Sequence, residues 1–383
     1  MIIGANNAYC SINTAVMHIT KIEIYRFSIP MVPFTIATGT MKFAQNMLVY
    51  IHTDEFLTGV GECSAFPMIV GETQDTCMVL AKDFAQLWIG KNAADISERM
   101  RELDSYIAGN HTAKSAFDIA LFDLAAKRKE LPLYKFLGGE YFEPESDITI
   151  GIGSVEEMAE QALEFVQNKK ANILKVKLGK QPQEDIRRME AIRTAVGPGI
   201  GLRIDANQGW DYESAVFALT GMKGMDIQFC EQPMPKLLDE KMPSLRRISS
   251  IPIMADESVF NHHDAERLIR NNACDFINIK LSKAGGIQEG LLIHDVCDKA
   301  DIPNMLGSML ESRVALSAKV HMALSCPNIR FYDLDTCLLG HLEDPVTNGV
   351  QYDGMKLKLP DLPGIGADVD PAYLRNCEKI IVQ

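Results

Sequence analysis

The chain has 383 residues, of which 47% are hydrophobic and 23% are charged, as in globular proteins with one large domain and a smaller one. The formal net charge is −13 and the basic residues form no stripe, which argues against nucleic acid as a partner and favours a small substrate. No apolar run approaches the roughly 20 residues that a membrane-spanning helix needs, and the first sixteen residues lack the features of a signal peptide. We therefore expect a cytoplasmic protein without a membrane partner, with nine scattered cysteines that stay reduced.

Residues 1–16 follow neither a helix nor a strand pattern and are interpreted as an N-terminal extension. From residue 17 to residue 56, apolar and polar residues alternate, as in M-H-I-T-K-I-E-I-Y-R-F-S-I-P, which predicts an antiparallel sheet with one solvent-exposed face. The stretch S-A-F-D-I-A-L-F-D-L-A-A-K-R-K follows with helical spacing and places Phe117, Ala120, Leu121 and Leu124 on one stripe. Residues 17–145 are therefore predicted to form an α+β domain.

From about Asp147 the pattern changes to a short apolar strand followed by a polar helical stretch, repeated eight times. The predicted strands are D-I-T-I-G-I, I-L-K-V-K-L, L-R-I-D, I-Q-F-C-E, P-I-M-A-D, F-I-N-I-K, P-N-M-L-G-S and F-Y-D-L-D. One unit is about 24 residues long, which suits a strand, a helix and two short loops. Residues 146–356 are thus predicted to form a (β/α)8 barrel, whose active site lies at the carboxyl ends of the strands. The alternative, an open doubly wound sheet, usually carries a glycine-rich phosphate loop after its first strand, and this sequence has none there.

Three successive predicted strands end in a carboxylate, at Asp205, Glu231 and Asp256. A single aspartate at a strand end usually caps a helix or forms a turn. Three in phase, spaced by 26 residues (231 less 205) and 25 residues (256 less 231), are hard to explain in that way. Their oxygens would repel one another unless a hard cation such as Mg²⁺ lay between them. One Mg²⁺ per chain is therefore predicted.

Two lysines flank this arc of carboxylates. Lys177 lies near the end of the second strand and Lys280 ends the sixth, so the two lie half a turn apart in an eight-stranded barrel. Either lysine alone would more often be a surface residue with a solvated ammonium group. Together they predict a base and an acid on opposite faces of a metal-bound ligand, able to remove a proton beside a carboxylate and return it from the other side. Lys175 lies on the same strand face as Lys177 and is predicted to lower its pKa as a positive neighbour.

The motifs K-V-K, R-I-D-A-N-Q-G-W, C-E-Q-P, M-A-D-E-S and I-N-I-K-L-S-K-A-G-G resemble those of the enolase superfamily, muconate-lactonizing subgroup, and are most similar to the dipeptide epimerases. The resemblance implies an isomerase with a modified TIM barrel, and a capping domain over residues 17–145 that residues 357–383 complete. It also implies that Asp205, Glu231 and Asp256 bind Mg²⁺ and that Lys177 and Lys280 are the acid/base pair.

The resemblance to dipeptide epimerases depends on the eighth strand, which carries Asp333 and Asp335 on one face. In dipeptide epimerases the matching D-x-D binds the α-ammonium group of the substrate, and two carboxylates would repel a purely anionic ligand. By resemblance, Thr149, Lys175 and Ser308 are further substrate contacts. The implied reaction inverts the α-carbon of the second residue of a dipeptide, with L-Ala-D-Glu to L-Ala-L-Glu, a murein peptide conversion, as the expected case.

Three alternatives stay open at this point. An o-succinylbenzoate synthase or a muconate cycloisomerase uses the same scaffold, and a non-catalytic binding protein would also keep the barrel. Substrate range is open as well, because Gly39 stands where glutamate-selective relatives have an arginine, so that less acidic second residues are expected to be accepted. The segments 31–45 and 62–73 are predicted to close over the barrel mouth, and a homo-oligomer is expected to be possible for a barrel of this type.

Overall fold

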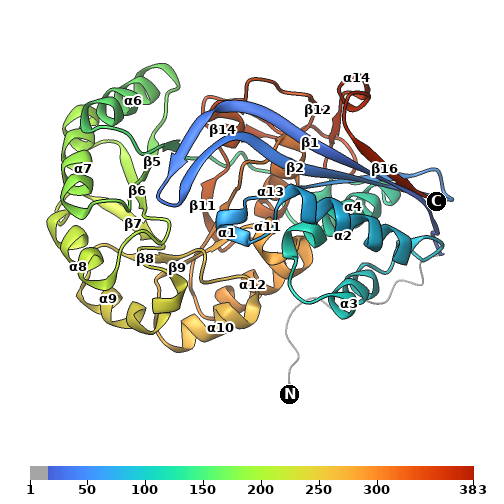
Figure 1. The fold of residues 1–383 in the computed structure, drawn as a ribbon, viewed down its shortest axis with the longest axis horizontal. Helices are drawn as coiled ribbons and strands as arrows, with labels where there is room; N and C mark the ends of the chain where they lie inside the picture. Colours follow the sequence, from blue (N-terminus) through green and yellow to red (C-terminus); the bar gives the residue numbers. More distant parts are fainter. Residues whose placement is uncertain (1–15) are drawn as a thin grey trace.

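The computed structural model describes residues 16–383 of the chain. Almost all of the predicted extension over residues 1–16 lies outside the described residues. Figure 1 shows a small antiparallel sheet with helices beside a larger ring of strands and helices. The predicted fold class, an eight-stranded α/β barrel with an α+β capping domain, is confirmed. Within residues 16–383, the structure contains no helix with the length and apolar character needed to cross a membrane.

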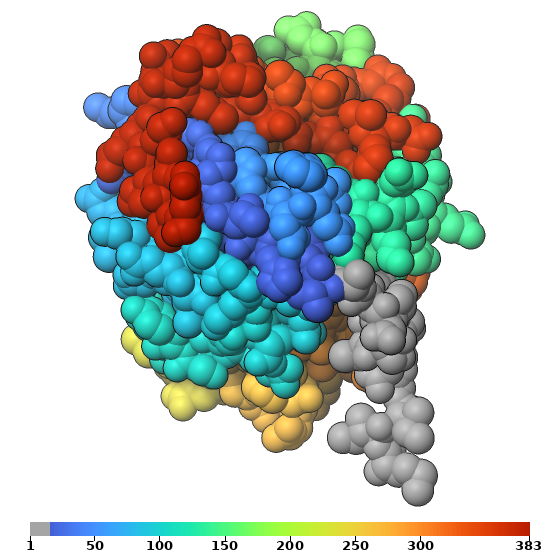
Figure 2. Space-filling view, turned by 90° about the vertical axis from the view of Figure 1, so that its right-hand side faces the viewer, coloured from blue at the N-terminus to red at the C-terminus, as the bar shows by residue number. Residues whose placement is uncertain are grey.

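The smaller sheet is antiparallel, with the strand order β16-β1-β2-β3. Its strands are β1 (Ile19–Ile36), β2 (Gly39–Thr53), β3 (Thr58–Ser64) and the C-terminal β16 (Lys379–Val382). Figure 2 shows the C-terminal segment, coloured red, lying against the blue and cyan N-terminal segments. Both faces of the sheet are partly covered, in contrast to the one exposed face that the alternation predicts. Ile22 and Ile24 pack towards the helices, whereas Phe27 on the other face contacts the ring of Tyr373, which is beyond the barrel in sequence.

The helices of the capping domain are α1 (Pro67–Val70), α2 (Gln74–Trp88), α3 (Ile96–Tyr106), α4 (His111–Arg128) and α5 (Leu133–Phe136). The predicted stripe on α4 is confirmed, because Phe117, Ala120, Leu121 and Leu124 all lie in the core between helices and sheet. Helix α4 approaches β3 closely. A Cβ atom at Gly61 would lie only 1.9 Å from the carbonyl oxygen of Ala116, so a glycine is required there.

The larger sheet has eight parallel strands in sequence order. They are β4 (Ile148–Ile150), β5 (Ile173–Lys177), β6 (Gly201–Asp205), β7 (Ile227–Glu231), β8 (Ile253–Ala255), β9 (Phe276–Ile279), β10 (Asn304–Gly307) and β11 (Ile329–Asp333), as the strand pattern predicts. The seam between β11 and β4 is bridged by a hydrogen bond of 3.1 Å from the backbone N–H of Asp147 to the carbonyl oxygen of Tyr332. The parallel strands therefore form a nearly closed barrel.

The helices between the strands cover the outside of the barrel. They are α6 (Val155–Asn168), α7 (Pro182–Val196), α8 (Tyr212–Gly221), η2 (Lys236–Lys241), α9 (Met242–Ile248), α10 (His262–Arg270), α11 (Leu281–Ala284), α12 (Ile287–Lys299) and α13 (Arg313–Ala323). Several begin at a side chain that accepts a backbone hydrogen bond, such as Ser154, Asp211 and Asn261. The chain continues through η3 (Thr336–Leu338), β12 (Val346–Asn348), β13 (Gln351–Asp353), β14 (Lys356–Lys358), β15 (Ala367–Val369) and α14 (Pro371–Leu374).

The interior of the barrel is layered along its axis. Phe229, Met254 and Met305 form a buried apolar cluster, against which Phe331 packs. The guanidinium group of Arg203 lies over the rings of Phe229 and Phe331, at 5.3 and 5.2 Å from their centroids. Alternate strand residues share a face, and two positions further along three of these strands stand the charged residues Glu231, Asp256 and Asp333. The apolar layer thus closes one end of the barrel beneath the charged layer.

Candidate active site

The three predicted metal ligands lie side by side on consecutive strands. Asp205 ends β6, Glu231 ends β7 and Asp256 follows β8, and all three side chains are fully buried. Lysine ammonium groups link them: Lys175 Nζ lies 3.4 Å from Asp205 Oδ2 and 2.7 Å from Glu231 Oε2, and Lys280 Nζ lies 3.9 Å from Glu231 Oε1. The structure thus brings these carboxylates together around shared cations.

Lys177 and Lys280 stand at opposite ends of this arc. Lys177 Nζ donates to Asp205 Oδ2 at 2.7 Å, and Lys280 Nζ donates to Asp256 Oδ2 at 2.8 Å. Burial alone would lower the pKa of Lys280, but the nearby carboxylates of Asp256 and Glu231 outweigh burial and raise it. Lys280 therefore carries a proton while these carboxylates are its neighbours.

Lys175 lies one step deeper on β5, fully buried. In addition to the contacts above, its Nζ donates to Asp333 Oδ2 at 2.6 Å. Burial opposes its charge, but Asp333, Glu231 and Asp205 together raise the pKa of Lys175 well above the ordinary value. Lys175 therefore stays cationic, which is the property that the predicted role as a positive neighbour requires.

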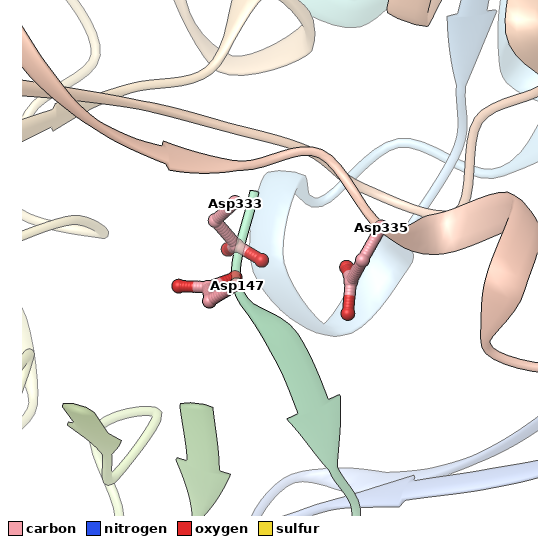
Figure 3. A group of neighbouring side chains, drawn as sticks. All are labelled: Asp147, Asp333 and Asp335. Carbon is pink, nitrogen blue, oxygen red and sulfur yellow. The ribbon is translucent and has the colours of Figure 1, made fainter. Parts of the chain in front are cut away.

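A second acidic group lies at the seam between β4 and β11. Asp147, Asp333 and Asp335 each offer a carboxylate oxygen, and these oxygens lie within 4.8 Å of one another. Figure 3 shows Asp147 beside Asp333, with Asp335 further along the chain after β11. The backbone N–H of Thr149 donates to Asp335 Oδ2 at 2.6 Å, and the hydroxyl of Ser308 donates to the carbonyl oxygen of Asp333 at 2.8 Å. The predicted substrate contacts thus surround one anionic corner of the barrel mouth.

These carboxylates have different proton affinities. Burial opposes ionisation of Asp333, but Lys175, Lys177 and Lys280 lower its pKa to about 2. Burial and the charge of Asp333 raise the pKa of Asp335 to about 7. Because one carboxylate is firmly ionised and another titrates near neutrality, the corner is suited to binding a cationic group.

Sequence reasoning missed several buried residues at the site. Lys283 Nζ lies 2.5 Å from Asp256 Oδ1, and Asn278 Nδ2 donates to Glu231 Oε1 at 2.8 Å. Asp147 was also not predicted as a site residue, although its position two residues before Thr149 places both side chains on one strand face. Strand alternation was the available signal for Asp147 and Asn278, whereas Lys283 follows the end of β9, where that periodicity no longer applies.

A cavity joins these groups to the capping domain. Its polar wall comes from the barrel and contains Lys177, Lys280, Asn207, Asp333 and Asp335; its apolar wall contains Phe34, Ile36, Phe66, Ile69, Leu310 and Leu339. Phe34 and Ile36 belong to the β1–β2 hairpin, within the segment 31–45 that was predicted to close over the barrel mouth. The two lysines therefore face a space that an apolar surface shields from water.

A parallel barrel with carboxylates on three successive strands, placed between two lysines in one cavity, defines an enzyme site for acid–base chemistry. The family model "Mandelate racemase / muconate lactonizing enzyme, N-terminal domain" matches residues 20–138, and "Enolase C-terminal domain-like" matches residues 157–373. The chain belongs to this mandelate racemase and muconate lactonizing enzyme family of the enolase superfamily. The predicted family is confirmed.

The chain is similar over nearly its full length to named enzymes. It is 41% identical to the D-Ala-D/L-Ala epimerase of Cytophaga hutchinsonii, over 96% of this chain and 100% of that protein. It is 38% identical to a hydrophobic dipeptide epimerase of Enterococcus faecalis, over 87% of this chain and 94% of that protein. The curated relatives also include a chloromuconate cycloisomerase of Pseudomonas putida at 29% identity, over 94% of this chain and 99% of that protein. These relatives confirm the prediction of an isomerase.

Solved structures agree with the sequence relatives. A dipeptide epimerase from Cytophaga hutchinsonii, complexed with Mg and D-Ala-L-Val, has a TM-score of 0.94, with 96% of this chain and 100% of that chain covered. A dipeptide epimerase from Enterococcus faecalis, complexed with Mg and L-Leu-L-Tyr, has a TM-score of 0.89, with 92% and 99% covered.

Proposed function

We propose that this protein is an Mg²⁺-dependent dipeptide epimerase that inverts the α-carbon of the second residue. The observation that carries the proposal is that Lys177 and Lys280, which pair with Asp205 and Asp256 at the two ends of the carboxylate arc, line one cavity whose polar wall also contains Asp333 and Asp335. An acid/base pair needs opposite faces of one carbon, and a free amino terminus needs a carboxylate partner. Relatives named as dipeptide epimerases support the same assignment.

The residues fit a divalent cation at Asp205, Glu231 and Asp256. All three offer only oxygen atoms, which Mg²⁺ prefers. Glu231 Oε2 and Asp256 Oδ1 are buried and accept no hydrogen bond, although ammonium groups of lysines lie close to both. The group of Asp147, Asp333 and Asp335 is a weaker candidate, because Asp147 pairs at 2.7 Å with the guanidinium group of Arg203, which unlike a lysine keeps its charge at any ordinary pH. A divalent cation at the first group supplies positive charge beside a substrate carboxylate and so makes the adjacent C–H more acidic.

The chain's own residues carry the proton. One of Lys177 and Lys280 accepts the proton as the C–H bond of the second α-carbon breaks, and the other donates a proton to the opposite face as the new C–H bond forms. Lys175 holds positive charge at the substrate carboxylate, and Asp333 with Asp335 accepts hydrogen bonds from the α-ammonium group. In this proposal residues 146–356 supply the catalytic groups, and residues 17–145 with 357–383 supply the apolar cover that excludes water.

The substrate range follows from the apolar wall. L-Ala-D-Glu to L-Ala-L-Glu, derived from murein in the cytoplasm, stays the proposed conversion. Within the residues that line the described cavity, the only basic side chains are Lys177 and Lys280, and a Cβ atom at Gly39 would lie 2.4 Å from Met68 Sδ. No arginine faces a glutamate side chain there, so we also expect turnover of dipeptides with an apolar second residue.

Proton exchange in D₂O tests this function. The wild type should incorporate deuterium at the second α-carbon of both L-Ala-D-Glu and L-Ala-L-Glu. In Lys177→Ala and in Lys280→Ala, the exchange rate of one of these two substrates should fall by at least about 10³-fold. Full exchange by both variants would refute the two-lysine mechanism. A panel of X-Glu and X-hydrophobic dipeptides tests the range, and exclusive turnover of the glutamate substrates would refute broad acceptance.

A second experiment separates the two acidic groups. Asp333→Ala and Asp335→Ala should raise the dipeptide KM steeply with little change in the Mg²⁺ concentration for half-maximal rate, whereas Asp256→Asn should raise that Mg²⁺ concentration. If Asp333→Ala and Asp335→Ala left the dipeptide KM unchanged, a cycloisomerase or synthase with an anionic substrate would become the better assignment.

A further inference from the structure

A groove of about 350 Å³ continues outward from the cavity that contains the two lysines. It runs between the β1–β2 hairpin, the loop after β4, helix α6 and the loop after η3. Phe34, Thr149 and Leu339 line both the groove and the cavity, so the two spaces meet at these residues. Nothing in the proposed proton transfer uses this groove.

The frame of the groove is held by backbone hydrogen bonds. The N–H of Val32 donates to the carbonyl oxygen of Gly340 at 2.8 Å, and the N–H of Ile152 donates to the carbonyl oxygen of Thr35 at 3.1 Å. The hairpin is therefore tied both to the loop after η3 and to the loop after β4. A space bounded in this way is largely formed before a ligand arrives.

The chemistry of the lining changes from the inside to the rim. Phe34, Met158, Phe165, Leu338 and Leu339 form an apolar interior, and Met158 and Phe165 are buried. The rim carries Glu157 and Gln161, which are exposed on α6. The groove contains no basic side chain among its described lining residues. An apolar group fits the interior, and an acidic group would meet the carboxylate of Glu157.

The junction of groove and cavity coincides with the anionic corner. Thr149 lines both spaces, and its backbone N–H binds Asp335. In a dipeptide whose α-ammonium group lies at Asp335 and whose second α-carbon lies between Lys177 and Lys280, the first α-carbon must lie at this junction. The side chain of the first residue then points into the groove.

We infer that the groove is the binding site for the side chain of the first residue of the dipeptide, and that it selects medium to large apolar side chains such as those of leucine and phenylalanine. This inference rests on the proposed dipeptide epimerase function. It extends the expected substrate range from alanine at the first position to larger residues. Burial of three further carbon atoms should favour Leu-Ala over Ala-Ala by roughly tenfold or more in kcat/KM.

Filling the groove tests the inference. A Cβ atom at Gly151 would lie 3.4 Å from the carbonyl oxygen of Thr35 and 3.6 Å from Phe34 Cε2, which is ordinary contact, so Gly151→Leu should place its side chain in the groove. Gly199→Leu is the matched control, because a Cβ atom at Gly199 meets nothing within 4 Å and the residue does not line the groove. Gln161→Trp, on the exposed face of α6, narrows the groove from its rim if Gly151→Leu does not fold.

Deuterium exchange at the second α-carbon would be measured with Ala-Ala, Leu-Ala, Phe-Ala and Glu-Ala. Leu-Ala and Phe-Ala should be the best wild-type substrates, and Gly151→Leu or Gln161→Trp should reduce their kcat/KM by about tenfold or more while leaving Ala-Ala within about threefold. Equal wild-type rates with Ala-Ala and Leu-Ala, or an equal loss with all four substrates, would overturn the groove assignment while leaving the epimerase function intact. No exchange with any dipeptide would instead refute the proposed function, and the groove assignment with it.

Discussion

Two buried carboxylates of the capping domain accept hydrogen bonds from the first residues of two barrel helices. Only one of these carboxylates is linked to a residue that lines the substrate cavity. Glu62 on β3 is fully buried and accepts hydrogen bonds from the backbone N–H groups of Ser312 and Ala315 at the start of α13, both at 2.9 Å, and from the Ser312 hydroxyl at 2.6 Å. It also accepts one from Asn46 Nδ2 at 2.7 Å, and the same amide donates to the carbonyl oxygen of Leu310 at 3.1 Å. Leu310 lines the cavity.

Glu62→Gln keeps the size of this side chain but replaces one accepting oxygen with an NH₂ group. Whichever way the amide turns, at least one backbone N–H then faces a donor instead of an acceptor. An unpaired buried donor costs about 1–3 kcal/mol. We therefore expect a loss of about 1–3 kcal/mol in the free energy of unfolding, together with an increase in the dipeptide KM because the loop that carries Leu310 loses its anchor.

Asp118→Asn is the matched control. Asp118 on α4 is also fully buried, and accepts from the backbone N–H groups of Ile287 and Gln288 at the start of α12, which contributes no described residue to the cavity. Urea unfolding should show a loss of stability in both variants, whereas deuterium-exchange kinetics should show a raised KM only in Glu62→Gln. Equal changes of KM in the two variants, or unchanged KM and stability in Glu62→Gln, would show that Glu62 does not anchor the loop that carries Leu310.

Three further outcomes are expected. Burial lowers the pKa of His321 to about 4. Its ring accepts a hydrogen bond from the backbone N–H of Tyr134 and contacts the carbonyl oxygen of Ile365. The neutral ring therefore contributes stability that is complete above about pH 6.5, the usual histidine pKa, and is lost as the pH falls towards 4. Between pH 7 and pH 4 the free energy of unfolding of the wild type should fall by about 3 kcal/mol more than that of His321→Gln. An equal dependence of this free energy on pH in the two proteins would contradict the role given to His321. Gly61→Ala should destabilise the chain by about 3 kcal/mol or more, because the new Cβ would overlap the Ala116 carbonyl oxygen; a melting temperature within 1–2 °C of the wild type, roughly the effect of a few tenths of a kcal/mol, would show that α4 can move away at low cost. Chelation by EDTA should abolish dipeptide exchange and added Mg²⁺ should restore it, and exchange that persists in EDTA would exclude the proposed cation requirement.

The strand ends of the barrel could be predicted from sequence because two regularities act together. Alternation fixes which residues of a strand face the interior, and the order of strands in a parallel barrel fixes which strand ends are neighbours. Asp205, Glu231 and Lys177 satisfied both conditions, and the structure brings them together. Outside the strands, alternation no longer shows which residues face the interior. Strand alternation would point Glu257 away from its neighbour Asp256, yet Glu257 lies beyond the end of β8, where it is 1% exposed and accepts a hydrogen bond from Asn207 Nδ2 at 3.3 Å.

The arrangement of Lys175 could not be foreseen from spacing alone, because it depends on which side chains share the barrel axis. Its ammonium group contacts Asp333 in one acidic group and Glu231 in the other, at 2.6 and 2.7 Å. A cation that binds at Asp333 competes with Lys175 for that carboxylate, so the two acidic groups are electrostatically coupled through one side chain. A substrate ammonium group at Asp333 would therefore free part of the positive charge of Lys175 for the substrate carboxylate. An anionic ligand without an ammonium group would leave Lys175 bound to Asp333, which gives the site a physical reason to distinguish a dipeptide from a simple dicarboxylate.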